Sequence, residues 1–134
     1  MGKRALIAVI DDDESVRESL PDLLREFGFA PQIFSSAEDF LTSEDISQCR
    51  CLILDMALPG MSGPDLQSEL KSRRIEIPII FITAYGEENA RSRLIERGAV
   101  DCLFKPFGDS ALLNAINAAL GMGGNVVCRC PGGI

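Results

Sequence analysis

Histidine is absent from the 134-residue chain, and tyrosine occurs only once. Without an imidazole, the sequence excludes Ser-His-Asp and Cys-His catalysis, phosphohistidine carriage and histidine-ligated zinc sites. Any acid and base chemistry must therefore come from Asp, Glu, Lys or Tyr side chains.

Long apolar segments and an excess of positive charge are missing as well. The longest apolar runs, residues 5–10 and 77–82, are far shorter than the ~18 residues that a membrane span requires. The 13 Lys and Arg residues are outnumbered by 20 Asp and Glu residues, and the net charge of −7 repels the phosphate backbone of nucleic acid. We therefore expect neither a membrane nor a nucleic acid to bind this chain directly.

Cysteine is sparse: the chain has five, an odd number, and no secretory signal precedes the first apolar run. This pattern predicts a reducing, cytoplasmic location. The pairs Cys49-x-Cys51 and Cys128-x-Cys130 leave one residue between the thiols. Because zinc knuckles usually leave at least two, the spacing disfavours a four-thiolate zinc site.

The composition that remains is that of one globular domain. Apolar residues make up 46% and charged residues 25%, and a chain of this length can bury a core without a disulfide or a structural metal. We place this domain in residues 1–120. Residues 121–134 contain five of the 12 glycines and no helical period, which predicts a flexible tail, either a linker stub or an expression remnant.

Short runs rich in Ile, Leu and Val alternate with longer amphipathic segments along that domain. The predicted strands are residues 5–10, 30–34, 51–54, 77–83 and 101–104, and the predicted helices are residues 15–27, 36–41, 64–73, 87–97 and 109–120. Gly28, Gly98 and Gly121 follow helical patterns, where a left-handed residue ends a helix. Because strands that are apolar throughout need helices on both faces, we predict a doubly wound α/β fold with a parallel sheet.

Charged and hydroxyl side chains lie at the ends of four of the five predicted strands. Asp11 and Asp12 come after the first, Asp55 after the third and Lys105 after the fifth, and Thr83 is the last residue of the fourth. The carboxyl ends of these strands meet at one edge of the sheet, where ligands bind in such folds. Clustered carboxylates repel one another unless a cation holds them ionised, and Mg²⁺ suits oxygen ligands and phosphoryl chemistry. Asp55 could then act as a nucleophile toward phosphorus.

Four motifs at the ends of these strands resemble those of the receiver domain of two-component response regulators. They are Ile10-Asp11-Asp12-Asp13-Glu14, Leu54-Asp55-Met56-Ala57-Leu58-Pro59-Gly60, Phe81-Ile82-Thr83-Ala84 and Phe104-Lys105-Pro106-Phe107. The resemblance extends over residues 5–120. It implies a flavodoxin-like fold of five βα units with the strand order 2-1-3-4-5.

The resemblance also implies roles for the acidic residues. Asp55 matches the phosphoacceptor. Asp11 and Asp12 match the acidic pair that holds Mg²⁺ (or Mn²⁺) together with Asp55, and Ala57 matches the residue whose backbone carbonyl completes the metal shell. Asp13 and Glu14 are interpreted more simply, as acids that favour the start of a helix.

The remaining matches concern the switch that follows phosphorylation. Thr83 matches the switch hydroxyl and Lys105 the lysine that contacts the phosphoryl group. Cys102 departs from the pattern, because the residue three before the lysine is commonly Tyr or Phe. We therefore expect the change to be read through shifts of the backbone and of the fourth helix rather than through a bulky rotamer. Tyr85, two residues after Thr83, is a candidate shield against attacking water.

The output surface and the partners follow from the same resemblance. The expected surface comprises the fourth helix, the fifth strand and the fifth helix, around Arg93, Arg97, Cys102 and Ala111. The expected partners are a sensor histidine kinase and a downstream effector domain or protein, with a phosphorylation-dependent homodimer as a further expectation. The motifs are similar to those of transcriptional regulators, which indicates control of transcription through a domain outside this chain.

Two alternatives to this interpretation stay open, and a third is disfavoured by the sequence. The chain could be a stand-alone receiver that acts as a phosphate shuttle or sink, or a binding module that is never phosphorylated. Haloacid-dehalogenase-type phosphatases also use a strand-end aspartate with Mg²⁺, but they carry a second aspartate two residues later. Ala57 stands at that position. We therefore expect no turnover of external phosphate esters, and no enzyme in that sense.

Overall fold

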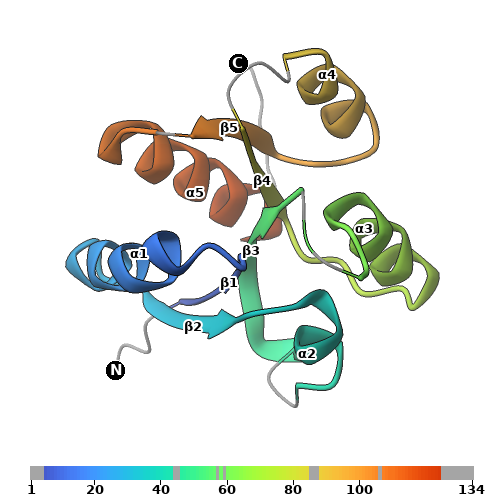
Figure 1. Cartoon of the computed structure of the whole chain (residues 1–134), viewed down its shortest axis with the longest axis horizontal. Coiled ribbons are helices and arrows are strands. Elements are labelled where there is room, and N and C mark those ends of the chain that lie inside the picture. The colour runs from blue at the N-terminus through green and yellow to red at the C-terminus, as the bar shows by residue number, and fades with distance from the viewer. Residues whose placement is uncertain are drawn as a thin grey trace.

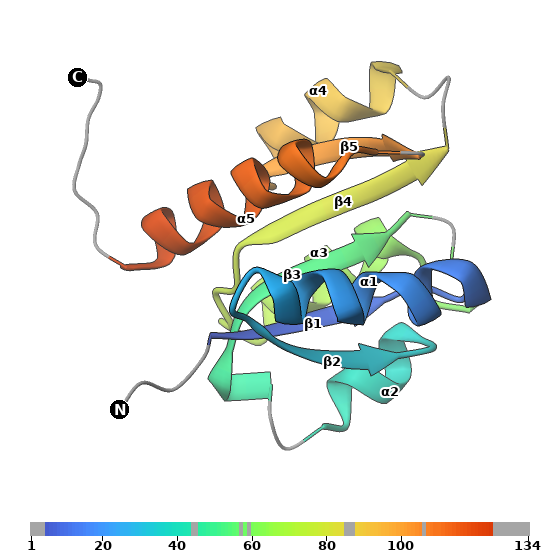
Figure 2. The same ribbon diagram turned by 90° about the vertical axis from the view of Figure 1, so that its left-hand side faces the viewer.

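The computed structural model describes residues 5–43, 46–56, 58, 60–84, 88–105 and 107–124. A five-stranded parallel sheet with the order β2-β1-β3-β4-β5 lies at its centre (Figure 1). The strands are β1 (Leu6–Ile10), β2 (Ala30–Phe34), β3 (Cys49–Asp55), β4 (Ile79–Ala84) and β5 (Asp101–Lys105). Figure 2 shows that all five strands point toward the same edge, so their carboxyl ends lie together.

Helices cover both faces of the sheet. They are α1 (Glu14–Glu26), α2 (Ala37–Leu41), α3 (Gly63–Ser72), α4 (Glu88–Glu96) and α5 (Asp109–Gly124), with a short 3₁₀ helix η1 (Ile46–Gln48) before β3. α1 and α5 pack on one face, and α2, α3 and α4 pack on the other (Figure 1). The predicted doubly wound α/β architecture is therefore confirmed.

Two hydrophobic cores follow from the alternation of side chains along the central strands. In β1, Ala8 and Ile10 face the core under α2, α3 and α4, whereas Ile7 and Val9 face the core under α1 and α5. All four side chains are almost completely buried. A strand buried on both faces must be apolar at every position, which explains the unbroken runs that predicted it.

Local signals in the sequence set most of the helix boundaries. Asp13 caps α1 by accepting a hydrogen bond from the backbone N–H of Ser15. Ser62 caps α3 in a reciprocal arrangement with Asp65. Gly28 and Gly98, at the ends of α1 and α4, have φ angles of 95° and 109°, as expected for left-handed residues that end helices.

The end of α5 differs from the prediction. The helix continues through Gly124, whereas Gly121 was predicted to end it and to begin the tail. Glycine permits a left-handed conformation without requiring it, so it can also remain helical at a cost of about 0.5–1 kcal/mol relative to alanine. The rest of the predicted tail, residues 125–134, lies outside the described residues. Among the helices that are described, none is both long enough and apolar enough to cross a membrane.

The cysteines of β3 do not form a paired site. Cys49 belongs to the core on one face of the sheet and Cys51 to the core on the other. β3 pairs with β1 through a register shift at this point, with Cys49 opposite Leu6 and Cys51 opposite Ile7. Burial raises the pKa of both thiols. These buried, protonated thiols behave as small apolar side chains.

Candidate functional site

Three carboxylates converge at the carboxyl edge of the sheet. Asp11 and Asp12 directly follow β1, and Asp55 is the last residue of the neighbouring strand β3. One carboxylate oxygen from each residue lies within 4.8 Å of the others. Asp11 is fully buried and Asp55 is 6% exposed, whereas Asp12 is exposed to solvent. The predicted acidic cluster is therefore present, and its hard oxygen donors fit a divalent cation such as Mg²⁺.

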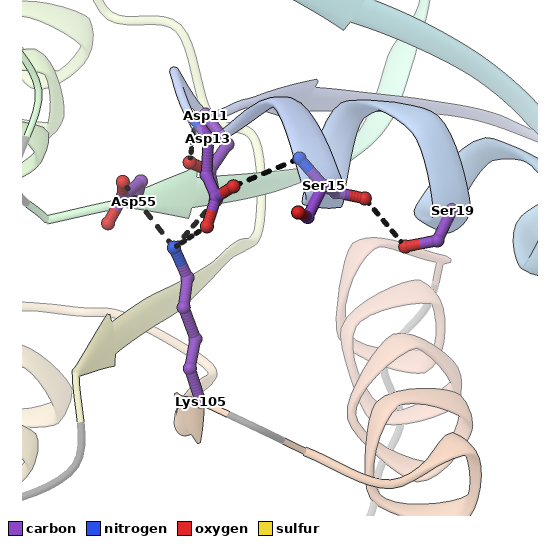
Figure 3. Close-up of polar contacts among 6 residues, drawn as sticks. All are labelled: Asp11, Asp13, Ser15, Ser19, Asp55 and Lys105. Carbon is purple, nitrogen blue, oxygen red and sulfur yellow. Dashed lines mark hydrogen bonds and ion pairs between the residues drawn. The ribbon is translucent and has the colours of Figure 1, made fainter.

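Lys105, at the end of β5, extends toward this cluster (Figure 3). Its Nζ atom lies 3.1 Å from Oδ2 of Asp11, 3.8 Å from Oδ2 of Asp55 and 3.9 Å from Oδ2 of Asp13. The lysine side chain is 26% exposed. It therefore compensates part of the negative charge that the strand ends bring together.

The charge of Lys105 is stabilised by these neighbours. Burial alone would lower the pKa of the ammonium group. The hydrogen bond with Asp11 and the charges of Asp11, Asp55 and Asp13 outweigh that effect and raise the pKa above its ordinary value. Lys105 is thus a permanent cation at neutral pH.

Asp11 is fixed by contacts on both of its carboxylate oxygens. Oδ1 accepts a hydrogen bond of 2.9 Å from the backbone N–H of Asp13, and Oδ2 forms the ion pair with Lys105 (Figure 3). Asp13 in turn caps α1. Asp13 therefore caps the start of the helix, as expected. Its carboxylate also forms a long ion pair with Lys105, at 3.9 Å.

Thr83 lies near the cluster, whereas two other predicted residues fall outside the described part of the chain. Thr83 is 5% exposed and lies in β4 one residue beyond Ile82, the partner of Asp55 in the sheet. This places it at the same edge as Asp55. Ala57, the predicted backbone ligand, and Tyr85, the predicted shield, are not among the described residues.

Comparison with known proteins agrees with this geometry. The family model of the response regulator receiver domain matches residues 7–117. The chain belongs to the response regulator receiver domain family. It has the flavodoxin-like fold of the structures that it resembles, with the strand order 2-1-3-4-5. One of these structures is FixJ-N, which is 34% identical. Its TM-score is 0.79, over 96% of this chain and 100% of that chain.

The chain matches only part of several longer relatives. Response regulator protein TodT of Pseudomonas putida is 45% identical over 118 residues, which are 88% of this chain and 52% of TodT. Nodulation protein W of Bradyrhizobium diazoefficiens is 46% identical over 87% of this chain and 51% of its own length. The structure of response regulator StyR has a TM-score of 0.83 at 44% identity, over 90% of this chain and 61% of that chain. This receiver domain thus spans about half the length of the curated relatives it matches.

Gly63 packs against the end of β3, beside Asp55, in a way that sequence reasoning missed. A Cβ atom at Gly63 would lie 2.7 Å from the carbonyl oxygen of Asp55 and 3.0 Å from Cα of Met56. The first turn of α3 therefore packs directly against the backbone at the end of β3. A glycine after the cap residue Ser62 gives no local signal of this contact, because it depends on how α3 packs against the sheet.

Cys102 is buried at 2% exposure on the α4–β5–α5 side of the receiver domain. It lines a surface cavity of about 550 Å³ together with Ser92, Asp101, Leu103, Phe104, Phe107 and Ala111. Arg93 and Arg97 are exposed on and after α4. A small, buried thiol therefore lies beside this cavity.

Proposed function

We propose that Asp55 accepts a phosphoryl group from the phosphohistidine of a sensor histidine kinase. The observation that carries this proposal is the convergence of three carboxylates within 4.8 Å, with a lysine Nζ 3.8 Å from Asp55. This combination offers a nucleophile, a cation-binding oxygen set and a fixed positive charge at one edge of the sheet. The reaction modifies the protein's own Asp55, so no external substrate is turned over.

The carboxylates supply a suitable site for Mg²⁺ (or Mn²⁺). Asp12 and Asp55 would hold the ion directly, with Asp11 behind them and the backbone carbonyl of Ala57 completing the shell. The bound ion would neutralise charge on the phosphoryl oxygens. Asp12 suits this role because it is exposed, whereas the charge of Asp11 is already paired with Lys105.

The chain's own residues provide the alignment for transfer. A carboxylate oxygen of Asp55 forms a bond to phosphorus while the bond from phosphorus to the histidine nitrogen breaks, and the electron pair leaves with the imidazole. The product is an aspartyl phosphate. Lys105 moves from Asp11 to a phosphoryl oxygen, and the hydroxyl of Thr83 donates a hydrogen bond to another.

Phosphorylation then selects between two states of the α4–β5–α5 surface. Residues 1–120 act as the receiver unit, and the output is control of transcription through a region outside this chain. Relatives named transcriptional regulatory proteins, FixJ of Azorhizobium caulinodans and TdiR of Thauera aromatica, support this role. We propose a cytoplasmic location and a phosphorylation-dependent homodimer for this regulator.

The test is the intact mass of the protein after incubation with acetyl phosphate, with and without Mg²⁺. A gain of one phosphoryl group that requires Mg²⁺ and is lost in Asp55→Asn supports the proposal. No mass gain, together with no Mg²⁺ binding, would instead indicate a binding module that works without phosphorylation.

A further inference from the structure

Glu38 connects α2 to the loop that follows Asp55. Its Oε2 atom accepts a hydrogen bond from the backbone N–H of Met61, with an N···O distance of 3.1 Å. Glu38 lies in the first turn of α2, whereas Met61 belongs to the segment between β3 and α3 (Figure 1). A charged acceptor from a different helix thus holds the loop that leaves the phosphoacceptor strand.

Gly60 makes room for this contact. Its φ angle is 77°, a conformation that is strained for other residues. A Cβ atom at this position would lie 3.0 Å from Oε2 of Glu38. Both the backbone conformation and the missing side chain therefore allow the carboxylate to approach the loop.

Other hydrogen bonds fix the two ends of the loop. The backbone N–H of Met56 donates to the carbonyl of Ile82 in β4 at 3.0 Å, and the N–H of Gly63 donates to the carbonyl of Met56 at 3.2 Å. These hydrogen bonds fix the backbone just after the end of β3 and at the start of α3. The bond from Met61 to Glu38 adds an anchor on the outer part of the loop, supplied by a third element.

We propose that Glu38 is a positioning residue for metal binding and phosphoryl transfer. The proposal rests on the function proposed above, in which the carbonyl of Ala57, in the same loop, completes the metal shell. Glu38 does not touch the reacting atoms. It holds the backbone of Met61 in place before the ion arrives, so that less of the chain between Asp55 and α3 has to be ordered on binding.

Three variants test this proposal. Glu38→Ala removes the acceptor, Glu38→Gln keeps a side-chain oxygen that can accept the bond, and Glu26→Ala removes an exposed carboxylate at the far end of α1 as a control. The measurements are hydrogen exchange at the Met61 amide, the Mg²⁺ dissociation constant by calorimetry, and the rate of phosphorylation by acetyl phosphate at limiting and saturating Mg²⁺.

For Glu38→Ala we expect faster exchange at Met61 and a Mg²⁺ dissociation constant raised by about three- to tenfold, below the range for residues that hold a metal ligand directly. The phosphorylation rate should fall at limiting Mg²⁺ and recover at saturation. Glu38→Gln and Glu26→Ala should behave like the native protein.

Two results with the variants would overturn the proposal: unchanged exchange at Met61 in Glu38→Ala, or native Mg²⁺ affinity despite faster exchange. An equal loss of Mg²⁺ affinity in Glu38→Gln would also overturn it, because the effect on the affinity would then come from the charge of Glu38 rather than from its hydrogen bond. Failure of the proposed function is recognised separately, since the native protein itself would then neither bind Mg²⁺ nor gain a phosphoryl group.

Discussion

Lys105 lies closer to Asp11 than to Asp55: its Nζ is 3.1 Å from Oδ2 of the first and 3.8 Å from Oδ2 of the second. Asp11 is fully buried, so its charge needs a close cation, whereas Asp55 retains 6% exposure at the edge of the sheet. The structure therefore describes a receiver in which the lysine compensates the buried acid. Transfer of a phosphoryl group to Asp55 would add a competing anion for the same ammonium group.

Replacing Lys105 by methionine should destabilise the protein, because it leaves the carboxylate of Asp11 buried without its cation. We expect a loss of about 2–3 kcal/mol in the free energy of unfolding, less than for a fully buried pair, since the lysine is 26% exposed. Urea unfolding measures this loss. Added Mg²⁺ should recover part of it.

The control is Arg25→Met, which breaks the exposed ion pair with Asp22 and should cost at most about 1 kcal/mol. Equal losses in the two variants would show that the buried position of Asp11 has no special effect.

The raised pKa of Lys105 predicts a loss of stability only at alkaline pH. A group with a raised pKa in the folded state contributes fully below its unfolded value of about 10.4, and the contribution disappears as the pH rises through the folded value. We expect the free energy of unfolding, measured from pH 8 to pH 11.5, to fall more steeply above about pH 10.4 for the native protein than for Lys105→Met. Parallel curves for the two proteins would contradict this.

Magnesium should stabilise the folded protein, because the unfolded chain does not bring the three carboxylates together. At a concentration 100 times the dissociation constant, we expect a gain of about 2.7 kcal/mol relative to the protein in EDTA. Thermal unfolding is the measurement. Asp12→Ala should lose most of the gain, whereas Asp22→Ala, an exposed acid in α1, should keep it.

Gly63→Ala should destabilise the protein by about 1–3 kcal/mol, because the added methyl group meets the backbone of Asp55 and Met56 rather than a flexible side chain. The displacement of Asp55 should also slow phosphorylation by acetyl phosphate. Gly108→Ala is the matched control, since a Cβ atom there meets nothing within 4 Å. Equal stability of the two variants would refute the close packing of α3 against the end of β3.

The sequence predicted those features of this receiver that depend on local pattern. Apolar runs located β1 and β3, and the residues that follow them gave Asp11 and Asp55 at one edge of the sheet. The preference of Lys105 for Asp11 could not be predicted, because it depends on the relative burial of two acids in the folded protein. The contact of Glu38 with Met61 joins separate elements and leaves no periodic signal. Cys102 was identified as a departure, and its burial beside a cavity required the structure.

The order of the strands along the chain has a consequence during synthesis. Asp11 and Asp55 leave the ribosome before Lys105, which ends the last strand of the sheet. Until β5 emerges and pairs with β4, Lys105 cannot compensate the two acids, and their like charges disfavour their approach unless a cation such as Mg²⁺ binds between them. We therefore expect that, without a bound cation, the cluster closes only once the fifth strand has docked. We expect a nascent chain to take up a phosphoryl group only after its fifth strand has docked.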